Sequence, residues 1–248
     1  MNRPTMLIVD DEATLRTVLG AMYTDAGFEV RTCGSAEEAL VDLAAKPCDV
    51  LVVDKNLPAM NGIDLARQVL GLGAAQHAVM ITGYPSTTSL IEAINVGIRG
   101  YLMKPFRTLD DAIKEAHFVV DNPPRRTRLG PVALRAHLDA SSPLDPAPSA
   151  VVVVSDVKVR DQFTRHLGGP IRTFGSVEFG LAALYDRPPD VVAADSVVDL
   201  LRMIERAPAA CGCYVGASPG FEDALRLMRA GPMLVAEPEQ LREGKRGT

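Results

Sequence analysis

Polar side chains follow four short apolar runs in the first half of the chain. The acidic pair Asp10 and Asp11 follows residues 6–9, Asp54 follows 50–53, Thr82 follows 78–81, and Lys104 follows 101–103. Because parallel strands of an open α/β sheet end at one edge, we expect these side chains to meet there. Crowded carboxylates repel one another, and a hard cation such as Mg²⁺ relieves that repulsion through oxygen ligands. One carboxylate can then attack phosphorus, while the ammonium and the hydroxyl stabilise the transferred phosphoryl group.

These residues resemble the receiver domain of two-component response regulators over residues 5 to about 121. The resemblance rests on Asp10-Asp11, on Asp54 with Leu57-Pro58 and Met60-x-Gly62, on Thr82-Gly83-Tyr84, on Tyr101, and on Lys104-Pro105-Phe106. It implies that Asp54 accepts a phosphoryl group and binds Mg²⁺ together with Asp10, Asp11 and the backbone carbonyl of Asn56. It also implies that Thr82 and Lys104 contact the phosphoryl group, and that Thr82 and Tyr101 form a conformational switch.

The resemblance implies a response regulator in a phosphorelay, with a histidine kinase or a histidine phosphotransfer protein as the donor. Such a protein transfers and hydrolyses only its own phosphoryl group, and it is not an enzyme with a separate substrate. Its output would be contact with a downstream protein or with a second copy of itself. One alternative is a scaffold of two receiver-like modules that works without phosphorylation. Another is a haloacid-dehalogenase-type phosphatase, but Asp54-Lys55-Asn56 lacks the second Asp, the general acid, of its Asp-x-Asp motif.

Composition further limits the classes of protein to which this chain could belong. The 248 residues carry a net charge of −5, which gives no argument for nucleic-acid or membrane binding. No apolar run approaches the roughly 20 residues of a membrane helix, and the start lacks the apolar stretch of a signal peptide, so we expect a cytoplasmic protein. We recognise no helix-turn-helix segment and expect no DNA-binding output. Cys211 and Cys213 are close in sequence, but no second Cys or His pair could complete a zinc site, which predicts buried thiols.

Apolar runs alternate with amphipathic stretches, which predicts an α/β fold of two tandem, doubly wound, five-stranded parallel sheets. In the first half we expect strands near 5–10, 28–32, 49–54, 77–82 and 100–103, and helices near 12–26, 35–45, 62–71, 86–96 and 107–120. Ser35 and Glu38 have the spacing of a capping box. The predicted organisation is a receiver at 1–121, a linker rich in Pro and Arg at 122–149, a second domain at 150–240 and a tail at 241–248. A short helix is possible near 132–138.

The second half repeats the first. Residues 172–195 align with 31–54 without gaps at a constant offset (172 − 31 = 141), with 11 of 24 positions identical, which predicts a second copy of the fold. The alignment equates Asp195 with Asp54, but the remaining chemistry is lost. It places Ser155 at Asp10, Asp156 at Asp11, Gly216 at Thr82 and Glu237 at Lys104. We therefore expect a degenerate pseudo-receiver that serves as an interaction or dimerisation module, with a doubtful last helix after residue 238.

Overall fold

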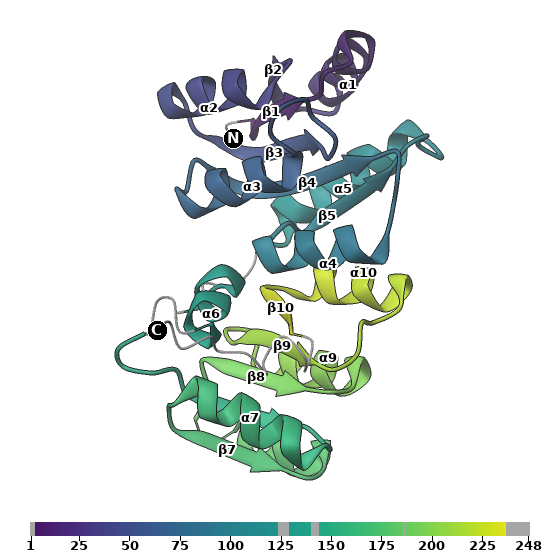
Figure 1. The fold of residues 1–248 in the computed structure, drawn as a ribbon. Coiled ribbons are helices and arrows are strands. Elements are labelled where there is room, and N and C mark those ends of the chain that lie inside the picture. Colours follow the sequence, from purple (N-terminus) through teal and green to yellow (C-terminus); the bar gives the residue numbers. More distant parts are fainter. Residues whose placement is uncertain (1–2, 124–128, 140–143, 186, 237–248) are drawn as a thin grey trace. The chain divides into compact units, whose positions relative to one another are not determined.

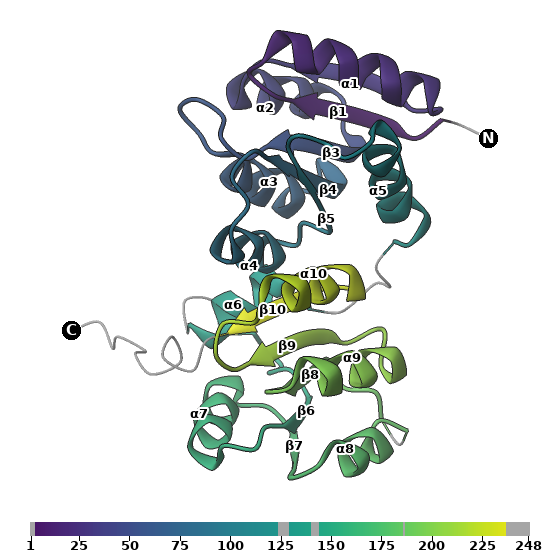
Figure 2. The ribbon, with the colours of Figure 1, turned by 90° about the vertical axis from the view of Figure 1, so that its right-hand side faces the viewer.

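The chain divides into two compact units, residues 1–123 and 124–248. The structure, a computed structural model, describes residues 3–123, 129–139, 144–185 and 187–236 (Figures 1 and 2). No helix within those ranges has both the length and the apolar composition needed to cross a bilayer.

The first unit alternates strands and helices, with bounds within two residues of those predicted. Its elements are β1 (Thr5–Val9), α1 (Ala13–Asp25), β2 (Glu29–Cys33), α2 (Ala36–Ala45), β3 (Cys48–Asp54), α3 (Gly62–Gly71), β4 (Ala75–Thr82), α4 (Thr87–Val96), β5 (Gly100–Met103) and α5 (Leu109–Asp121). The sheet is parallel throughout, in the order β2-β1-β3-β4-β5. This topology brings the ends of β1, β3, β4 and β5 to one edge.

Helices cover both faces of this sheet. Helices α1 and α5 pack together, and their apolar side chains share one core with β1, β3 and β4. Helices α2, α3 and α4 pack side by side in chain order (Figure 2). Burial on both faces explains why residues 50–53, in the middle of the sheet, are all apolar and fully buried.

Helix α3 begins against the end of β3, and only glycine fits there. A Cβ on Gly62 would lie 2.1 Å from the carbonyl oxygen of Asp54. The Gly62 N–H donates to the carbonyl of Lys55 at 2.8 Å, which ties the first turn of the helix to the residue after the strand. The glycine in Met60-x-Gly62 therefore lets a helix start within contact of the Asp54 backbone.

The capping box predicted at α2 forms with one changed partner. Ser35 Oγ accepts a hydrogen bond from the Glu38 N–H at 3.2 Å, as expected for an N-cap residue. Glu38 Oε2 accepts from the N–H of Gly34 at 2.8 Å, one residue before the usual partner.

The second unit has the same strand order as the first. Its elements are α6 (Pro131–Leu138), β6 (Ala150–Val153), α7 (Val157–Leu167), β7 (Ile171–Phe174), α8 (Val177–Ala183), β8 (Val191–Ala194), α9 (Val197–Arg206), β9 (Cys211–Val215), α10 (Phe221–Ala230) and β10 (Met233–Ala236). The parallel sheet runs β10-β9-β8-β6-β7, which matches β5-β4-β3-β1-β2. The predicted second copy of the fold is thus confirmed. Cys211 and Cys213 are free, buried thiols in β9, and burial raises the pKa of Cys211 to about 12.

Helix α6 lies in the segment predicted as a linker, yet it packs into the second unit. It contacts α7 and β10, whereas α5 contacts the matching elements α1 and β5 in the first unit. Leu134 and Leu138 are buried in one core with Phe163 and Leu234. A helix that precedes the sheet in sequence therefore covers the face that α5 covers in the first unit. Residues 124–128 and 140–143 of the predicted linker, and the residues after 236, lie outside the described residues.

A buried histidine fixes α6 in that place. His137 Nε2 is 2.8 Å from the carbonyl oxygen of Leu167 at the end of α7, and His137 Nδ1 accepts from the N–H of Leu144 at 3.0 Å. The ring is therefore a neutral tautomer with a proton on Nε2. It joins α6, α7 and the segment that leads to β6.

Candidate functional site

An ammonium group bridges two buried carboxylates at the edge where the strands of the first unit end. Lys104 Nζ is 2.8 Å from Asp10 Oδ2 and 2.5 Å from Asp54 Oδ1. Asp10 and Asp54 are 1% and 5% exposed. They follow β1 and end β3, and Lys104 follows β5, so three strands separated in sequence supply one cluster.

Backbone N–H groups satisfy the other two carboxylate oxygens. Asp54 Oδ2 accepts from the N–H of Asn56 at 2.5 Å, and Asp10 Oδ1 accepts from the N–H of Glu12 at 2.9 Å. Each of the four buried oxygens therefore has a donor, as buried charged groups require. Both carboxylates are held in fixed orientations, with the lysine between them.

Two opposing effects act on the pKa of Lys104. Burial, the largest single one, pulls the pKa of Lys104 down, but the hydrogen bonds and charges of Asp10 and Asp54 together outweigh it, and the pKa is raised. The ammonium is therefore charged at neutral pH. It neutralises one of the two negative charges that it contacts (−2 + 1 = −1).

The two predicted switch residues lie on neighbouring strands. Thr82 ends β4 and is fully buried; its hydroxyl oxygen accepts from the N–H of Tyr84 at 3.1 Å, and its carbonyl accepts from the N–H of Lys104 at 2.8 Å. Tyr101, in β5, lies inward at 6% exposure with its hydroxyl 3.2 Å from Ser89 Oγ in α4. No sequence pattern indicated this partner, because the spacing of Ser86 and Ser89 predicts only a helix cap.

The donor chemistry at this edge fits a hard divalent cation. Two buried carboxylates with a net charge of −1 after pairing offer the oxygen ligands that Mg²⁺ prefers. Asp11 is exposed beside them, and Asn56 contributes a contact through its N–H. Within the described residues, no three or more His, Cys, Asp or Glu side chains are already arranged around a metal position. Asp11 and the Asn56 carbonyl thus remain predicted ligands.

The register of the second sheet corrects two predicted equivalences, that of Ser155 with Asp10 and that of Asp156 with Asp11. Val9 pairs with Val53 in the first unit, and Val153 pairs with Ala194 in the second. Val154, buried at 1% exposure, therefore stands where Asp10 stands, and Ser155 stands at the position of Asp11. Asp156 is the N-cap residue of α7, as Glu12 is of α1. Both members of the acidic pair are lost, rather than one.

The carboxylate of Asp195 survives in altered surroundings. It accepts hydrogen bonds from the N–H of Ser155 at 2.7 Å and from the Ser155 hydroxyl. Gly216 occupies the position of Thr82, and the Tyr214 hydroxyl fills that space, 2.8 Å from where a Cβ would lie. Val235 stands at the level of Tyr101. Glu237, predicted at the position of Lys104, lies outside the described residues.

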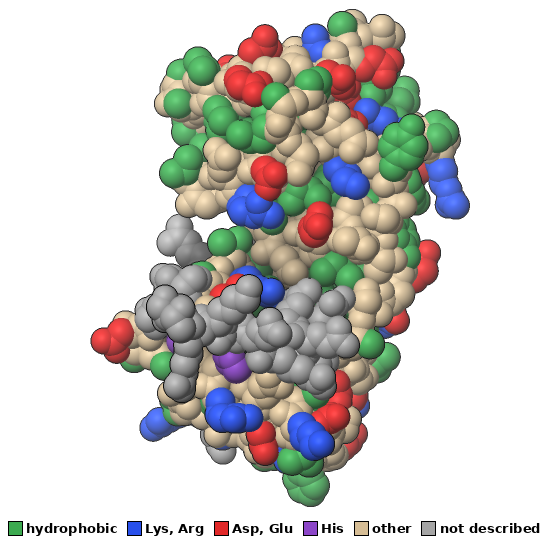
Figure 3. Space-filling view, in the orientation of Figure 1, with side chains coloured by type: hydrophobic (Ala, Val, Ile, Leu, Met, Phe, Trp, Pro, Cys, Tyr) green, Lys and Arg blue, Asp and Glu red, His purple; other side chains and the backbone are tan. Residues whose placement is uncertain are grey.

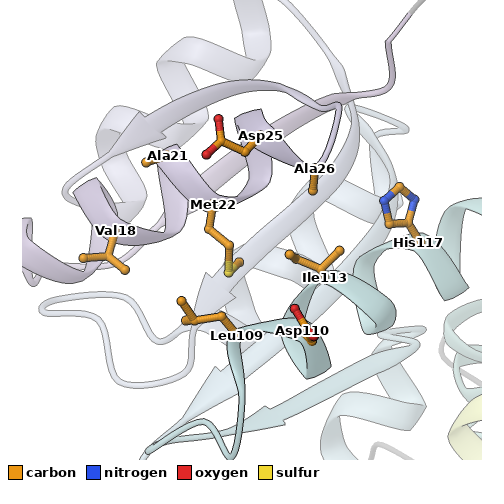
Figure 4. Close-up of a pocket in the computed structure, with 9 residues that line it drawn as sticks. All are labelled: Val18, Ala21, Met22, Asp25, Ala26, Leu109, Asp110, Ile113 and His117. Carbon is orange, nitrogen blue, oxygen red and sulfur yellow. The ribbon is translucent and has the colours of Figure 1, made fainter.

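A groove between α1 and α5 is separate from the carboxylate cluster. Its volume is about 700 Å³, and Met22 and Ile113 lie between the two helices (Figure 4). Val18 and Leu109 are 44% and 47% exposed at its margin, with Asp25 nearby. None of Asp10, Asp54, Thr82 or Lys104 lines it, so the candidate chemistry lies at the open sheet edge.

On the face shown in Figure 3, charged side chains of both signs are interspersed.

Comparison with known proteins identifies a family for the first unit. The family described as "Response regulator receiver domain" matches residues 6–116. The chemotaxis protein CheY of Pseudomonas aeruginosa is 36% identical over 104 residues, which cover 41% of this chain and 84% of CheY. This chain belongs to the response regulator receiver family. Its receiver domain lies in the first unit, and receiver domains generally bind Mg²⁺ and interact with histidine kinases or phosphotransfer proteins.

Other relatives of the receiver domain are longer. The DNA-binding response regulator MtrA of Mycobacterium tuberculosis is 33% identical over 105 residues, covering 42% of this chain and 46% of MtrA. The C4-dicarboxylate transport regulatory protein DctD of Rhizobium meliloti is 31% identical over 103 residues, covering 42% of this chain and 22% of DctD. The match thus spans less than half of either relative. A CheY-like receiver domain from Methanospirillum hungatei has a TM-score of 0.47 and 26% identity, covering 49% of this chain and 96% of that one.

Proposed function

We propose that this protein is a response regulator that accepts a phosphoryl group on Asp54 from a histidine kinase or a histidine phosphotransfer protein. The observation that carries the proposal is the Lys104 ammonium held between Asp10 and Asp54 at 2.8 and 2.5 Å. A strand-end carboxylate with a second carboxylate and an ammonium beside it has what phosphoryl transfer needs: a nucleophile, cation ligands and a charge for the transferred group.

Asp54 acts as the nucleophile in this proposal. A carboxylate oxygen forms a bond to phosphorus as the bond from phosphorus to the donor imidazole nitrogen breaks, and the nitrogen keeps the electron pair. Mg²⁺, held by Asp54 and Asp10 with Asp11 and the Asn56 carbonyl, would neutralise charge on the phosphoryl oxygens. Lys104 turns from the carboxylates toward the phosphoryl group, and Thr82 donates its hydroxyl to it.

The phosphoryl group adds about −1.5 to −2 charges at pH 7 beside these residues. Movement of Thr82 toward it releases the contact with the Tyr84 N–H, which is at 3.1 Å. Tyr101 and its partner Ser89 join that movement to α4, so the surface formed by α4, β5 and α5 changes. A shift from 1:99 to 99:1 between two conformations requires about 5.5 kcal/mol of preference for the active one.

The second unit serves as a protein-contact module in this proposal. The loss of both residues of the acidic pair supports this role, since Val154 and Ser155, which stand at those two positions, supply no carboxylate beside Asp195. The output is a protein contact made in the cytoplasm, with a downstream protein or a second copy as partner. The protein acts only on its own phosphoryl group.

The test is the intact mass of the full chain after incubation with Mg²⁺ and acetyl phosphate. Wild type, Asp54→Ala and Asp195→Ala are compared, because Asp195 is the matching position of the repeat. We expect one phosphoryl adduct, labile to hydroxylamine as an acyl phosphate is, in wild type and Asp195→Ala, and none in Asp54→Ala. Size-exclusion chromatography of the same samples shows whether phosphorylation changes assembly.

Two outcomes contradict the assignment. An adduct that persists in Asp54→Ala would place the acceptor elsewhere. No adduct in wild type, with acetyl phosphate or with a phosphorylated donor protein, would leave Asp54 with a structural role. The alternative of a scaffold that works without phosphorylation would then be preferred.

A further inference from the structure

The backbone of Asp10 is held by a residue outside the carboxylate cluster. The paired residues of β1 and β2 end at Val9 and Cys33, and the Asp10 N–H approaches the Cys33 carbonyl at 3.4 Å. The carbonyl oxygen of Asp10 accepts from Arg16 Nη1 at 2.6 Å. Directly after β2, the strand paired with β1, the N–H of Gly34 donates to Glu38 Oε2. Two charged side chains thus bind backbone groups just beyond the last paired residues of the two strands.

Asp10 is consequently fixed at three points. Lys104 holds one carboxylate oxygen, the N–H of Glu12 holds the other, and Arg16 holds the carbonyl. Arg16 lies in the first turns of α1, and its guanidinium lies 3.5 Å from where a Cβ on Gly34 would be, in ordinary contact distance. It fixes the peptide unit that follows the Asp10 side chain. Asp10 is only 1% exposed, so its carboxylate depends on these protein contacts and not on water. A change in the orientation of that peptide would therefore displace the carboxylate from its partners.

The second unit provides a comparison within the same molecule. The strand register equates Arg16 with Arg160, each the fourth residue of its helix. Arg160 has a carboxylate contact with its neighbour Asp161 at 4.0 Å. No atom of the described residues lies within 4 Å of a Cβ built on Gly175, which matches Gly34. An arginine is present in both copies, but among the described residues its side chain bonds backbone only in the first copy, where Asp10 is kept, and not in the second, where Val154 stands instead.

We propose that Arg16 is a positioning residue for the cation and phosphoryl site. It holds Asp10 where that carboxylate shares the Lys104 ammonium with Asp54, so both carboxylates face the same cation. This inference rests on the proposed function of that site. Partners that orient metal ligands typically contribute about 10–100-fold to metal affinity. We therefore expect loss of Arg16 to weaken Mg²⁺ binding about 10-fold.

The test is a titration of the full-length protein with Mg²⁺ alone, followed by ¹⁵N NMR. The reporters are the backbone amides of Glu12 and Asn56, which donate to the two carboxylates. Arg16→Ala should raise the Mg²⁺ concentration at half-saturation about 10-fold and shift the Glu12 amide even without metal. Arg16→Lys, which keeps a donor, should recover part of the affinity. Arg160→Ala, the matched control, should leave both readouts unchanged.

The outcomes separate this inference from the function on which it rests. A folded Arg16→Ala protein with the wild-type Mg²⁺ midpoint and Glu12 amide shift overturns the role of Arg16, whatever happens to thermal stability. If Arg16→Ala does not fold, Arg16→Met, which keeps the aliphatic length without an N–H donor, gives the same comparison. If wild type itself takes up neither Mg²⁺ nor a phosphoryl group, the proposed function fails. The metal-free Glu12 amide then still decides whether Arg16 positions Asp10.

Discussion

Replacing Gly62 by alanine should disrupt the junction between β3 and α3. The added Cβ would lie 2.1 Å from the carbonyl oxygen of Asp54 and 2.9 Å from Val53 Cγ2. Since real Cβ contacts essentially never fall below 3.0 Å, the two backbones must separate by at least 0.9 Å (3.0 − 2.1). No side-chain rotation relieves a contact with backbone, so we place the strain near the upper end of the usual range for overpacking, about 3 kcal/mol. The gain of about 1 kcal/mol from alanine in a helix leaves a net loss of about 2 kcal/mol.

The same helix provides the control. Gly71 ends α3, and no atom in the described part of the chain lies within 4 Å of a Cβ built on it, so Gly71→Ala should be neutral or stabilise by about 0.5 kcal/mol. Two units unfold in one chain, so hydrogen exchange with mass spectrometry should follow peptides from residues 1–123 separately. We expect Gly62→Ala to lower the melting temperature of the first unit, followed through those peptides, by about 8 °C, at roughly 4 °C per kcal/mol. It should also slow the proposed phosphorylation of Asp54. A Gly62→Ala protein as stable as Gly71→Ala would refute the steric reasoning.

Two further predictions concern residues away from the site. Burial chiefly, and Arg99 in addition, lower the pKa of His77 below its ordinary value of about 6.5, so the folded state binds fewer protons than the unfolded chain. The free energy of unfolding of the first unit should therefore fall as pH drops below about 6.5. Urea unfolding at about pH 7.5 and about pH 5.5 should show a smaller fall for His77→Gln than for wild type. Equal falls in the two proteins would contradict this reasoning. Leu134→Ala should destabilise the second unit by about 2–4 kcal/mol, since Leu134 is fully buried, whereas Val132→Ala, at a 43% exposed position of the same helix, should change it by less than about 0.5 kcal/mol. Equal effects in urea unfolding would mean that α6 is not part of that core.

Much of the first unit could be predicted because its signals are local. Apolar runs of strand length bounded by helical patterns gave elements within two residues of the observed bounds. Parallel strands then bring Asp10, Asp54, Thr82 and Lys104 to one edge whatever the side-chain details. The internal repeat predicted the second sheet for the same reason, since a copied pattern of apolar residues specifies a copied strand order.

The degenerate edge of the second unit could be predicted only in outline. The gapless alignment of 172–195 on 31–54 does not extend to the preceding strand, where an insertion or deletion in the connection changes the offset. Only the pairing of Val153 with Ala194 shows that Val154, and not Ser155, stands at the position of Asp10. In a parallel sheet, a shift of one residue turns a side chain to the opposite face, so this register decides which chemistry survives.

The sequence by itself determined the α/β architecture, the strand-end chemistry of the receiver domain and the presence of a second copy, because these follow from periodicity and from residue types at strand ends. Tertiary structure alone decided that Lys104 joins Asp10 to Asp54, that Arg16 holds the Asp10 carbonyl, and that α6 covers the second sheet. Each of these contacts depends on side-chain reach and on which sheet face lacks a cover. Such partners are settled only when the whole unit packs, because a local pattern carries no information about distances between elements remote in sequence.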